Sequence, residues 1–142
     1  KKITFHIKRM PGENIELDFA GKQLFLHDPR DSERITKVTV FIATLSYSDY
    51  FYAEAMAECD IRNWIRVNNN AIEYFGGITP NITPDNCKVA VNKNSDWINP
   101  ELNKDFREWA DHNNAVILPA KVRSPQIYIQ KKIISNYLKI TF

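Results

Sequence analysis

The sequence predicts a mixed α/β domain in which a sheet is covered by helices. Two observations carry this prediction. The first half of the chain contains short segments of alternating apolar and polar residues, and after residue 60 the apolar residues change to helical spacing. The chain has 142 residues, the size of one domain. With 44% hydrophobic residues it can form a core, so a wholly disordered chain is excluded.

The first half of the chain is predicted to form an antiparallel meander with short turns. A leading strand and a turn at Pro11-Gly12 occupy residues 1–13. Residues 37–45 are apolar on both faces, as expected for a central strand. The other predicted strands are residues 14–20, 23–27 and 50–56.

Helices and short strands are predicted to alternate in the second half. Apolar spacing from Ile61 to Phe75 indicates an amphipathic helix, with Asp60 as its N-cap and Gly76-Gly77 at its end. The aromatic residues expected on the inner faces of the helices are Trp64, Tyr74, Phe75, Phe106 and Trp109. The remaining predicted elements are a strand at residues 78–83, a helix that begins at Asn99-Pro100, a strand at residues 115–118 and a final helix at residues 126–140.

Charge is unevenly distributed along the chain. There are 19 Lys and Arg residues against 17 Asp and Glu, a net charge of +2. From His112 to Phe142 the chain has basic residues but no Asp or Glu, so the preceding part is mildly acidic. A basic tail beside an acidic body predicts a surface that tolerates polyanions.

The cysteines and the hydropathy pattern bear on the cellular compartment. Cys59 and Cys87 lie in unrelated contexts that indicate neither a zinc knuckle nor a disulfide framework. No apolar run approaches the roughly 20 residues of a membrane-spanning helix. We therefore expect a soluble intracellular domain with free thiols.

Two aspartates are candidates for metal chemistry. Asp18 lies in an otherwise apolar strand, where a carboxylate is costly unless it is paired or binds a metal. The alternative is a solvated edge strand, which Glu16 on the same face supports. Asp85 follows a short strand in Thr-Pro-Asp-Asn, where the alternative is a turn cap. Right-handed crossovers would place its strand parallel to, and near, that of Asp18, and converging carboxylates hold hard cations such as Mg²⁺.

Several blocks of sequence resemble IstA-type insertion-sequence transposases in content and order. The blocks are residues 15–22 (IELDFAGK), Asp28-Pro29, residues 40–45 (VFIATL), Tyr52-Ala53-Glu54-Ala55, residues 74–77 (YFGG), residues 84–88 (PDNCK) and residues 116–120 (VILPA). The resemblance extends to about Pro125. It implies a ribonuclease H-like α/β core related to retroviral integrase, with a mixed five-stranded sheet (antiparallel first three strands, then parallel) flanked by helices. Residues 1–142 would be a single such catalytic core domain, a fragment of a longer protein.

The resemblance also implies a catalytic role for the two aspartates. Asp18 and Asp85 would be the first two carboxylates of a DDE triad and would bind Mg²⁺ or Mn²⁺ for DNA cleavage and strand transfer. The third carboxylate is missing, because the family position falls on Lys132 or Ser135 and no acid follows Asp111. We therefore expect weak metal binding and negligible strand transfer.

Two alternatives to an active transposase core follow. The first is a catalytically dead remnant that binds DNA or oligomerises, which the missing acid favours. The second is an unrelated ribonuclease H-like nuclease, which the PDN and YFGG blocks disfavour.

DNA is the expected partner. The residues that could contact it are Lys88, Lys93, Trp97, Lys121 and Arg123. Ordinary solvated side chains are the alternative for the four basic ones, and the contact of Trp97 is implied by the resemblance alone. The resemblance further implies a homo-oligomer, an ATPase helper protein and the cytoplasm of a bacterium.

Overall fold

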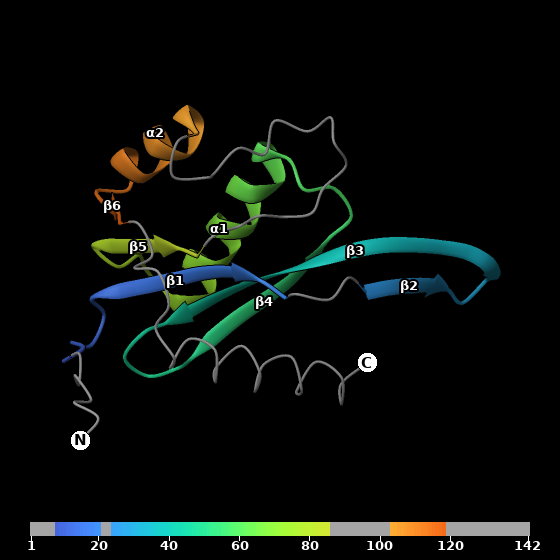
Figure 1. The fold of residues 1–142 in the computed structure, drawn as a ribbon, viewed down its shortest axis with the longest axis horizontal. Coiled ribbons are helices and arrows are strands. Elements are labelled where there is room, and N and C mark those ends of the chain that lie inside the picture. The colour runs from blue at the N-terminus through green and yellow to red at the C-terminus, as the bar shows by residue number, and fades with distance from the viewer. Residues whose placement is uncertain (1–7, 21–23, 86–102, 119–142) are drawn as a thin grey trace, which may run out of the picture.

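A mixed sheet with two helices packed against it forms the part of the chain that the computed structural model describes, residues 8–20, 24–85 and 103–118 (Figure 1). The strands are β1 (Asn14–Phe19), β2 (Leu24–Asp28), β3 (Asp31–Leu45), β4 (Phe51–Met56), β5 (Asn81–Pro84) and β6 (Val116–Ile117). The helices are α1 (Ile61–Phe75) and α2 (Lys104–His112). The predicted mixed α/β architecture is confirmed. In the described part of the chain, no helix is long and apolar enough to cross a membrane.

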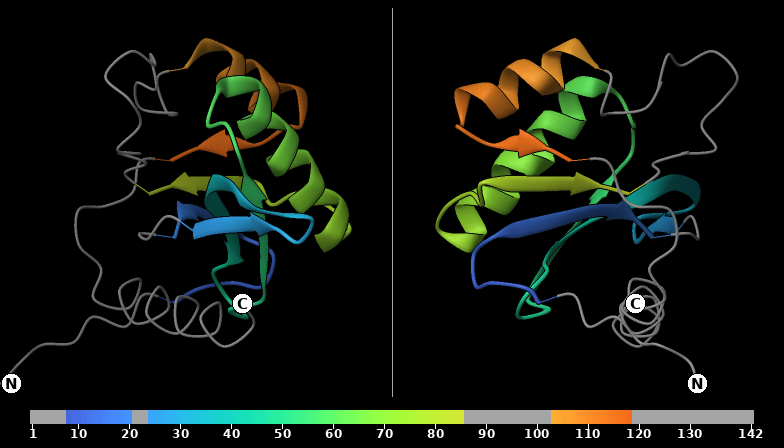
Figure 2. Two further views of the ribbon diagram at one scale, coloured as in Figure 1. Left: turned by 90° about the vertical axis from the view of Figure 1, so that its right-hand side faces the viewer. Right: turned by 60° about the vertical axis from the view of Figure 1, so that its left-hand side comes forward.

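Strand β3 organises the sheet. It pairs antiparallel with β1, β2 and β4, while β1 pairs parallel with β5 and β5 pairs parallel with β6 (Figure 2). The predicted meander is wrong in one respect, because β1 and β2 are not paired with each other. Both lie along β3, β1 beside residues 41–45 and β2 beside residues 31–38. Within the described residues the sheet has six strands, where five were predicted.

Three element boundaries differ from the prediction. Strand β3 begins at Asp31 instead of residue 37, because pairing with β2 extends it through mostly polar residues. Strand β5 begins at Asn81 instead of residue 78, directly after Pro80, which has no amide hydrogen to donate. Helix α2 begins at Lys104 because the Asn103 side chain caps it by accepting a hydrogen bond from the Phe106 amide at 3.2 Å. The final helix at residues 126–140 and most of the leading strand lie outside the described residues.

Helix α1 has the predicted bounds and caps. The Asp60 carboxylate accepts a hydrogen bond from the Asn63 amide at 2.7 Å. Gly76 ends the helix in the left-handed conformation, with φ of 78°. Its amide bonds to the Glu73 carbonyl, and that of Gly77 bonds to the Ile72 carbonyl. The local sequence alone therefore determines where this helix starts and stops.

Gly76→Ala is expected to destabilise the chain by about 1–2 kcal/mol. The cost comes from the backbone alone, because a Cβ at Gly76 would meet no atom within 4 Å. Gly77→Ala is the matched control, since Gly77 has the same open surroundings without a left-handed φ, and should be neutral or slightly stabilising. Urea unfolding measures both, and equal effects would contradict the assignment of the strain to Gly76.

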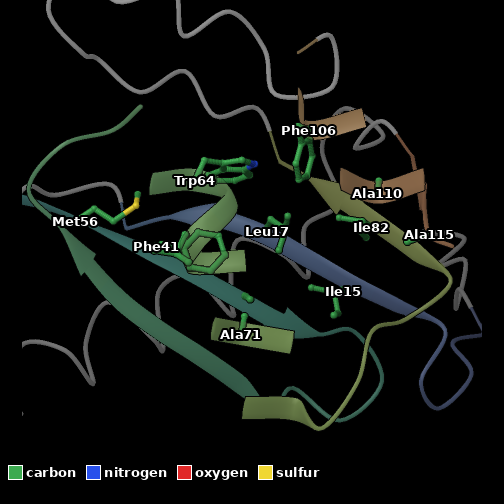
Figure 3. Close-up of a cluster of buried hydrophobic side chains, with 12 residues drawn as sticks. Ile15, Leu17, Phe41, Met56, Trp64, Ala71, Ile82, Phe106, Ala110 and Ala115 are labelled. Atoms are coloured by element: carbon green, nitrogen blue, oxygen red, sulfur yellow. The ribbon is translucent and has the colours of Figure 1, made fainter. Parts of the chain in front are cut away.

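The main core lies between the sheet and both helices (Figure 3). Trp64 of α1 is at its centre and fully buried, with its ring 5.3 Å from those of Phe19 and Phe41 and 5.6 Å from that of Phe106. The other buried members are Ile15, Leu17, Ala43, Met56, Val67, Ala71, Ile82, Ala110 and Ala115. The prediction that Tyr74 belongs to this core is wrong. Tyr74 lies at the end of α1, where its side chain is 49% exposed and its ring stacks on that of Tyr50.

Candidate metal and DNA site

Asp18 lies near the end of β1 on the face that does not carry the main core. Ile15 and Leu17 are buried among the core residues, so strand alternation places Asn14, Glu16 and Asp18 on the opposite face. Asp18 pairs with Ile42 of β3 and is half-buried. The strand is internal to the sheet, between β3 and β5, so the alternative of a solvated edge strand is wrong.

Asp85 directly follows β5 and lies beside the end of β1 that carries Asp18. The parallel pairing of β1 with β5 puts Leu17 beside Pro84, and the Asp85 amide then donates a hydrogen bond of 2.8 Å to the Leu17 carbonyl. Asp85 is therefore next to Asp18, where two parallel strands end at one edge of the sheet, and it is half-buried too. The predicted parallel arrangement is confirmed, and the catalytic role of the two carboxylates stays a prediction.

Glu16 is engaged in a polar network that the sequence analysis missed. Its carboxylate accepts a hydrogen bond from the Ser46 hydroxyl at 2.9 Å and lies 3.3 Å from the Arg9 guanidinium. The Asn14 amide donates to the same hydroxyl at 2.7 Å and accepts from the Thr83 hydroxyl at 2.8 Å. The network links β1, β5 and the β3–β4 turn one step away from Asp18. The alternation of Asn14 with Glu16 was its only sequence signal.

A second polar cluster fastens α1 to β4. The Glu54 carboxylate accepts hydrogen bonds from Tyr52, Arg66 and Asn70. Burial alone would raise the pKa of Glu54, but these hydrogen bonds and the Arg66 charge hold it below its ordinary value. Burial, followed by the bond to Glu54, raises the pKa of Tyr52 to about 12. All the donors that satisfy Glu54 come from its own strand and from α1, so the cluster is structural.

The donor set at Asp18 and Asp85 fits a hard divalent cation. Mg²⁺ takes oxygen ligands and commonly uses one or two carboxylates together with water and substrate phosphates. Among the described residues there is no group of three or more His, Cys, Asp or Glu side chains that could hold a metal by themselves. The other predicted site residues lie outside the described ranges: Lys88, Lys93, Trp97, Lys121, Arg123, Lys132 and Ser135.

Solved structures share this arrangement of strands and helices. The catalytic core domain of HTLV-2 integrase in complex with magnesium, in its trimeric form, matches with a TM-score of 0.62 and 14% identity over 93% of this chain and 72% of that chain. A simian T-cell lymphotropic virus intasome in complex with the PP2A regulatory subunit B56 gamma matches with a TM-score of 0.64 over 95% of this chain and 42% of that chain, also at 14% identity. The fold is that of an integrase catalytic core. The predicted ribonuclease H-like fold is confirmed.

Sequence relatives of this integrase-like core are named as insertion-sequence transposases. The transposase for IS1162 of Pseudomonas fluorescens is 36% identical over 125 residues, which are 88% of this chain and 22% of that protein. A transposase of Sinorhizobium fredii is 30% identical over 87% of this chain and 24% of its own length. The IS640 transposase of Shigella sonnei is 28% identical over 99% of this chain and 43% of its own length. The chain thus spans about a quarter of the length of the first two relatives, and no protein-family model matches it.

Proposed function

We propose that the chain is the catalytic core of an IstA-type DNA transposase, impaired by the absence of its third carboxylate. The pairing of β1 with β5, which puts Asp18 beside Asp85, is the observation that carries the proposal. Homology to insertion-sequence transposases supports DNA as the substrate. A homo-oligomeric assembly in the bacterial cytoplasm and an ATPase helper are parts of the same proposal.

In this proposal the chain binds and orients the metal ions and the DNA. None of its side chains forms a covalent bond with the DNA. Asp18 and Asp85 would hold Mg²⁺ or Mn²⁺, which when bound would activate the attacking oxygen and stabilise the leaving oxygen. Lys88, Lys93, Lys121 and Arg123 would bind phosphates, and Trp97 would contact DNA beside the site. Water attacks in the cleavage step and a DNA 3′-hydroxyl in the joining step. The chain's task is to align these oxygens with the scissile phosphate.

The second candidate function is DNA binding or oligomerisation without catalysis. The chain has five Lys and Arg residues after His112 and no Asp or Glu after Asp111. With only two of the three carboxylates, a second cation would lose an anchoring oxygen. A lysine at the third position would place a positive charge where a cation has to bind.

A nicking and strand-joining assay on a labelled DNA duplex, with Mg²⁺ or Mn²⁺, tests the proposal. The chain itself should show negligible activity. Lys132→Glu or Ser135→Glu should raise nicking above that background, and adding Asp18→Asn should abolish the gain. Lys131→Glu is the matched control for Lys132→Glu, because it makes the same charge change beside the proposed position.

The other outcomes separate the alternatives. Salt-sensitive DNA binding without cleavage in every variant would favour the second candidate. Robust activity of the unaltered chain, lost in Asp18→Asn, would contradict the proposed impairment. Cleavage of an RNA–DNA hybrid alone would instead identify a ribonuclease.

A further inference from the structure

Strand β2 and the first half of β3 form a two-stranded ribbon that projects beyond the rest of the sheet (Figure 1). The β3 residues from Asp31 to Lys37 are all exposed. So are three large apolar side chains, with Phe25 59%, Leu26 44% and Ile35 53% accessible. An isolated two-stranded hairpin is marginally stable in water. Exposed apolar residues on such a ribbon indicate that something covers it.

One edge of the ribbon has no strand partner in the part of the chain that the structure describes. Strand β4 pairs with β3 only between Thr39 and Thr44, so the edge of residues 32–38 on that side pairs with none of the described residues. The direction of the backbone groups follows from two hydrogen bonds. The Val40 carbonyl accepts from Ala20 on the β1 side, and the Leu45 amide donates to Tyr50 on the β4 side. Even-numbered residues of β3 therefore bond toward β1 and β2, and odd-numbered residues face the open edge.

The odd-numbered residues at this edge are complementary to a second copy of themselves. If two copies pair antiparallel with Ile35 opposite Ile35, Glu33 of each copy lies opposite Lys37 of the other. This register gives two opposite-charge pairs that flank one apolar pair on a single face. It also makes the odd-numbered positions the hydrogen-bonded ones, as the backbone direction requires. Such cross-strand pairs stabilise a sheet.

The charge of the ribbon argues against DNA as the partner. Its acidic residues, Asp28, Asp31 and Glu33, are matched in number by the basic residues Arg30, Arg34 and Lys37. Binding along a phosphate backbone needs an excess of basic residues. We propose that two copies of the chain associate edge to edge through residues 33–37 of β3, in a two-fold arrangement that continues the ribbon across the interface.

Charge reversal tests this interface. Glu33→Lys and Lys37→Glu should each weaken dimerisation on the order of tenfold, because each creates two like-charge pairs. The double variant should restore the affinity, since it only exchanges the charges. Arg34→Glu is the matched control, because its neighbour across the interface would be the uncharged Thr36. Sedimentation equilibrium over a concentration series measures the dissociation constant, and circular dichroism checks the fold.

A cysteine at the two-fold axis gives an independent readout. Opposed hydrogen-bonded residues have Cα atoms about 5.5 Å apart, within the range of a disulfide. In a Cys59→Ser/Cys87→Ser background, Ile35→Cys should form a disulfide-linked dimer under mild oxidation, and Thr36→Cys should not. A chain that stays monomeric, or single reversals that act like Arg34→Glu, would overturn the proposal. A monomer whose DNA affinity falls with Lys37→Glu would also overturn it and identify nucleic acid as the partner.

Discussion

Asp18→Asn and Asp85→Asn are each expected to lower the affinity of the chain for Mn²⁺ by at least about tenfold. At metal sites, even mutation of residues that only hydrogen-bond to the ligands lowers metal affinity or activity by about 10–100-fold. Each substitution removes one negative charge and a carboxylate oxygen and keeps the side-chain shape. The pairing of β1 with β5 brings both groups to one edge of the sheet, so one ion should depend on both. Titration with Mn²⁺, followed by the electron paramagnetic resonance signal of the free ion, measures the affinity.

The controls for the proposed metal site make the same substitution elsewhere in the chain. Asp111→Asn, at an exposed position of α2, makes an identical change and should leave the affinity unaltered. The double variant should lose little more than either single variant, because the contributions of two ligands to one ion are not independent. If all three single variants behaved alike, the metal would be held by general surface charge and the assigned site would be wrong.

Trp64→Ala is expected to destabilise the chain by about 3–5 kcal/mol, the usual cost of truncating a buried tryptophan or phenylalanine. Trp64 is fully buried and contacts Phe19, Phe41 and Phe106 from two strands and the second helix. Its loss leaves a cavity at the point where these elements meet. A domain is typically stable by only about 5–15 kcal/mol, so the variant should be partly unfolded at 37 °C.

Urea unfolding followed by far-UV circular dichroism tests the role of Trp64. Tyr47→Ala is the control, since Tyr47 is 58% exposed and removal of an exposed side chain usually changes stability by no more than about 0.5 kcal/mol. A loss below about 1 kcal/mol for Trp64→Ala would mean that the two helices are held to the sheet without this contact.

Helix α1 was predictable because its signals are local. Asp60 and Gly76 act on the backbone within a few residues, so they fix the helix ends in any surroundings. The closeness of Asp18 and Asp85 followed from the handedness of crossovers and from the family resemblance. No third carboxylate could be assigned, because the chain has no Asp or Glu after Asp111 to align.

The ribbon and the Glu16 network were not predictable because they depend on contacts between residues that are far apart in the sequence. Residues 31–36 are exposed and, apart from Ile35, polar, and only the pairing with β2 makes them a strand. A turn after Phe19 suggested that β1 and β2 pair with each other, but both use the same edge of β3. Glu16 meets Ser46 thirty residues away, a contact that only the folded sheet creates.

The pairing of β1 with β5 sets the spacing between the backbone positions of Asp18 and Asp85. Neighbouring strands lie about 4.8 Å apart, and oxygens bound to Mg²⁺ each lie about 2.1 Å from it, so one strand spacing is close to the width of one coordinated ion. A slip of β5 by a single residue would turn Asp85 toward the helices, away from the face that carries Asp18. The spacing of Asp18 and Asp85 along the sheet is therefore set by backbone hydrogen bonds, and a sequence that keeps this register keeps that spacing, whatever helices cover the sheet.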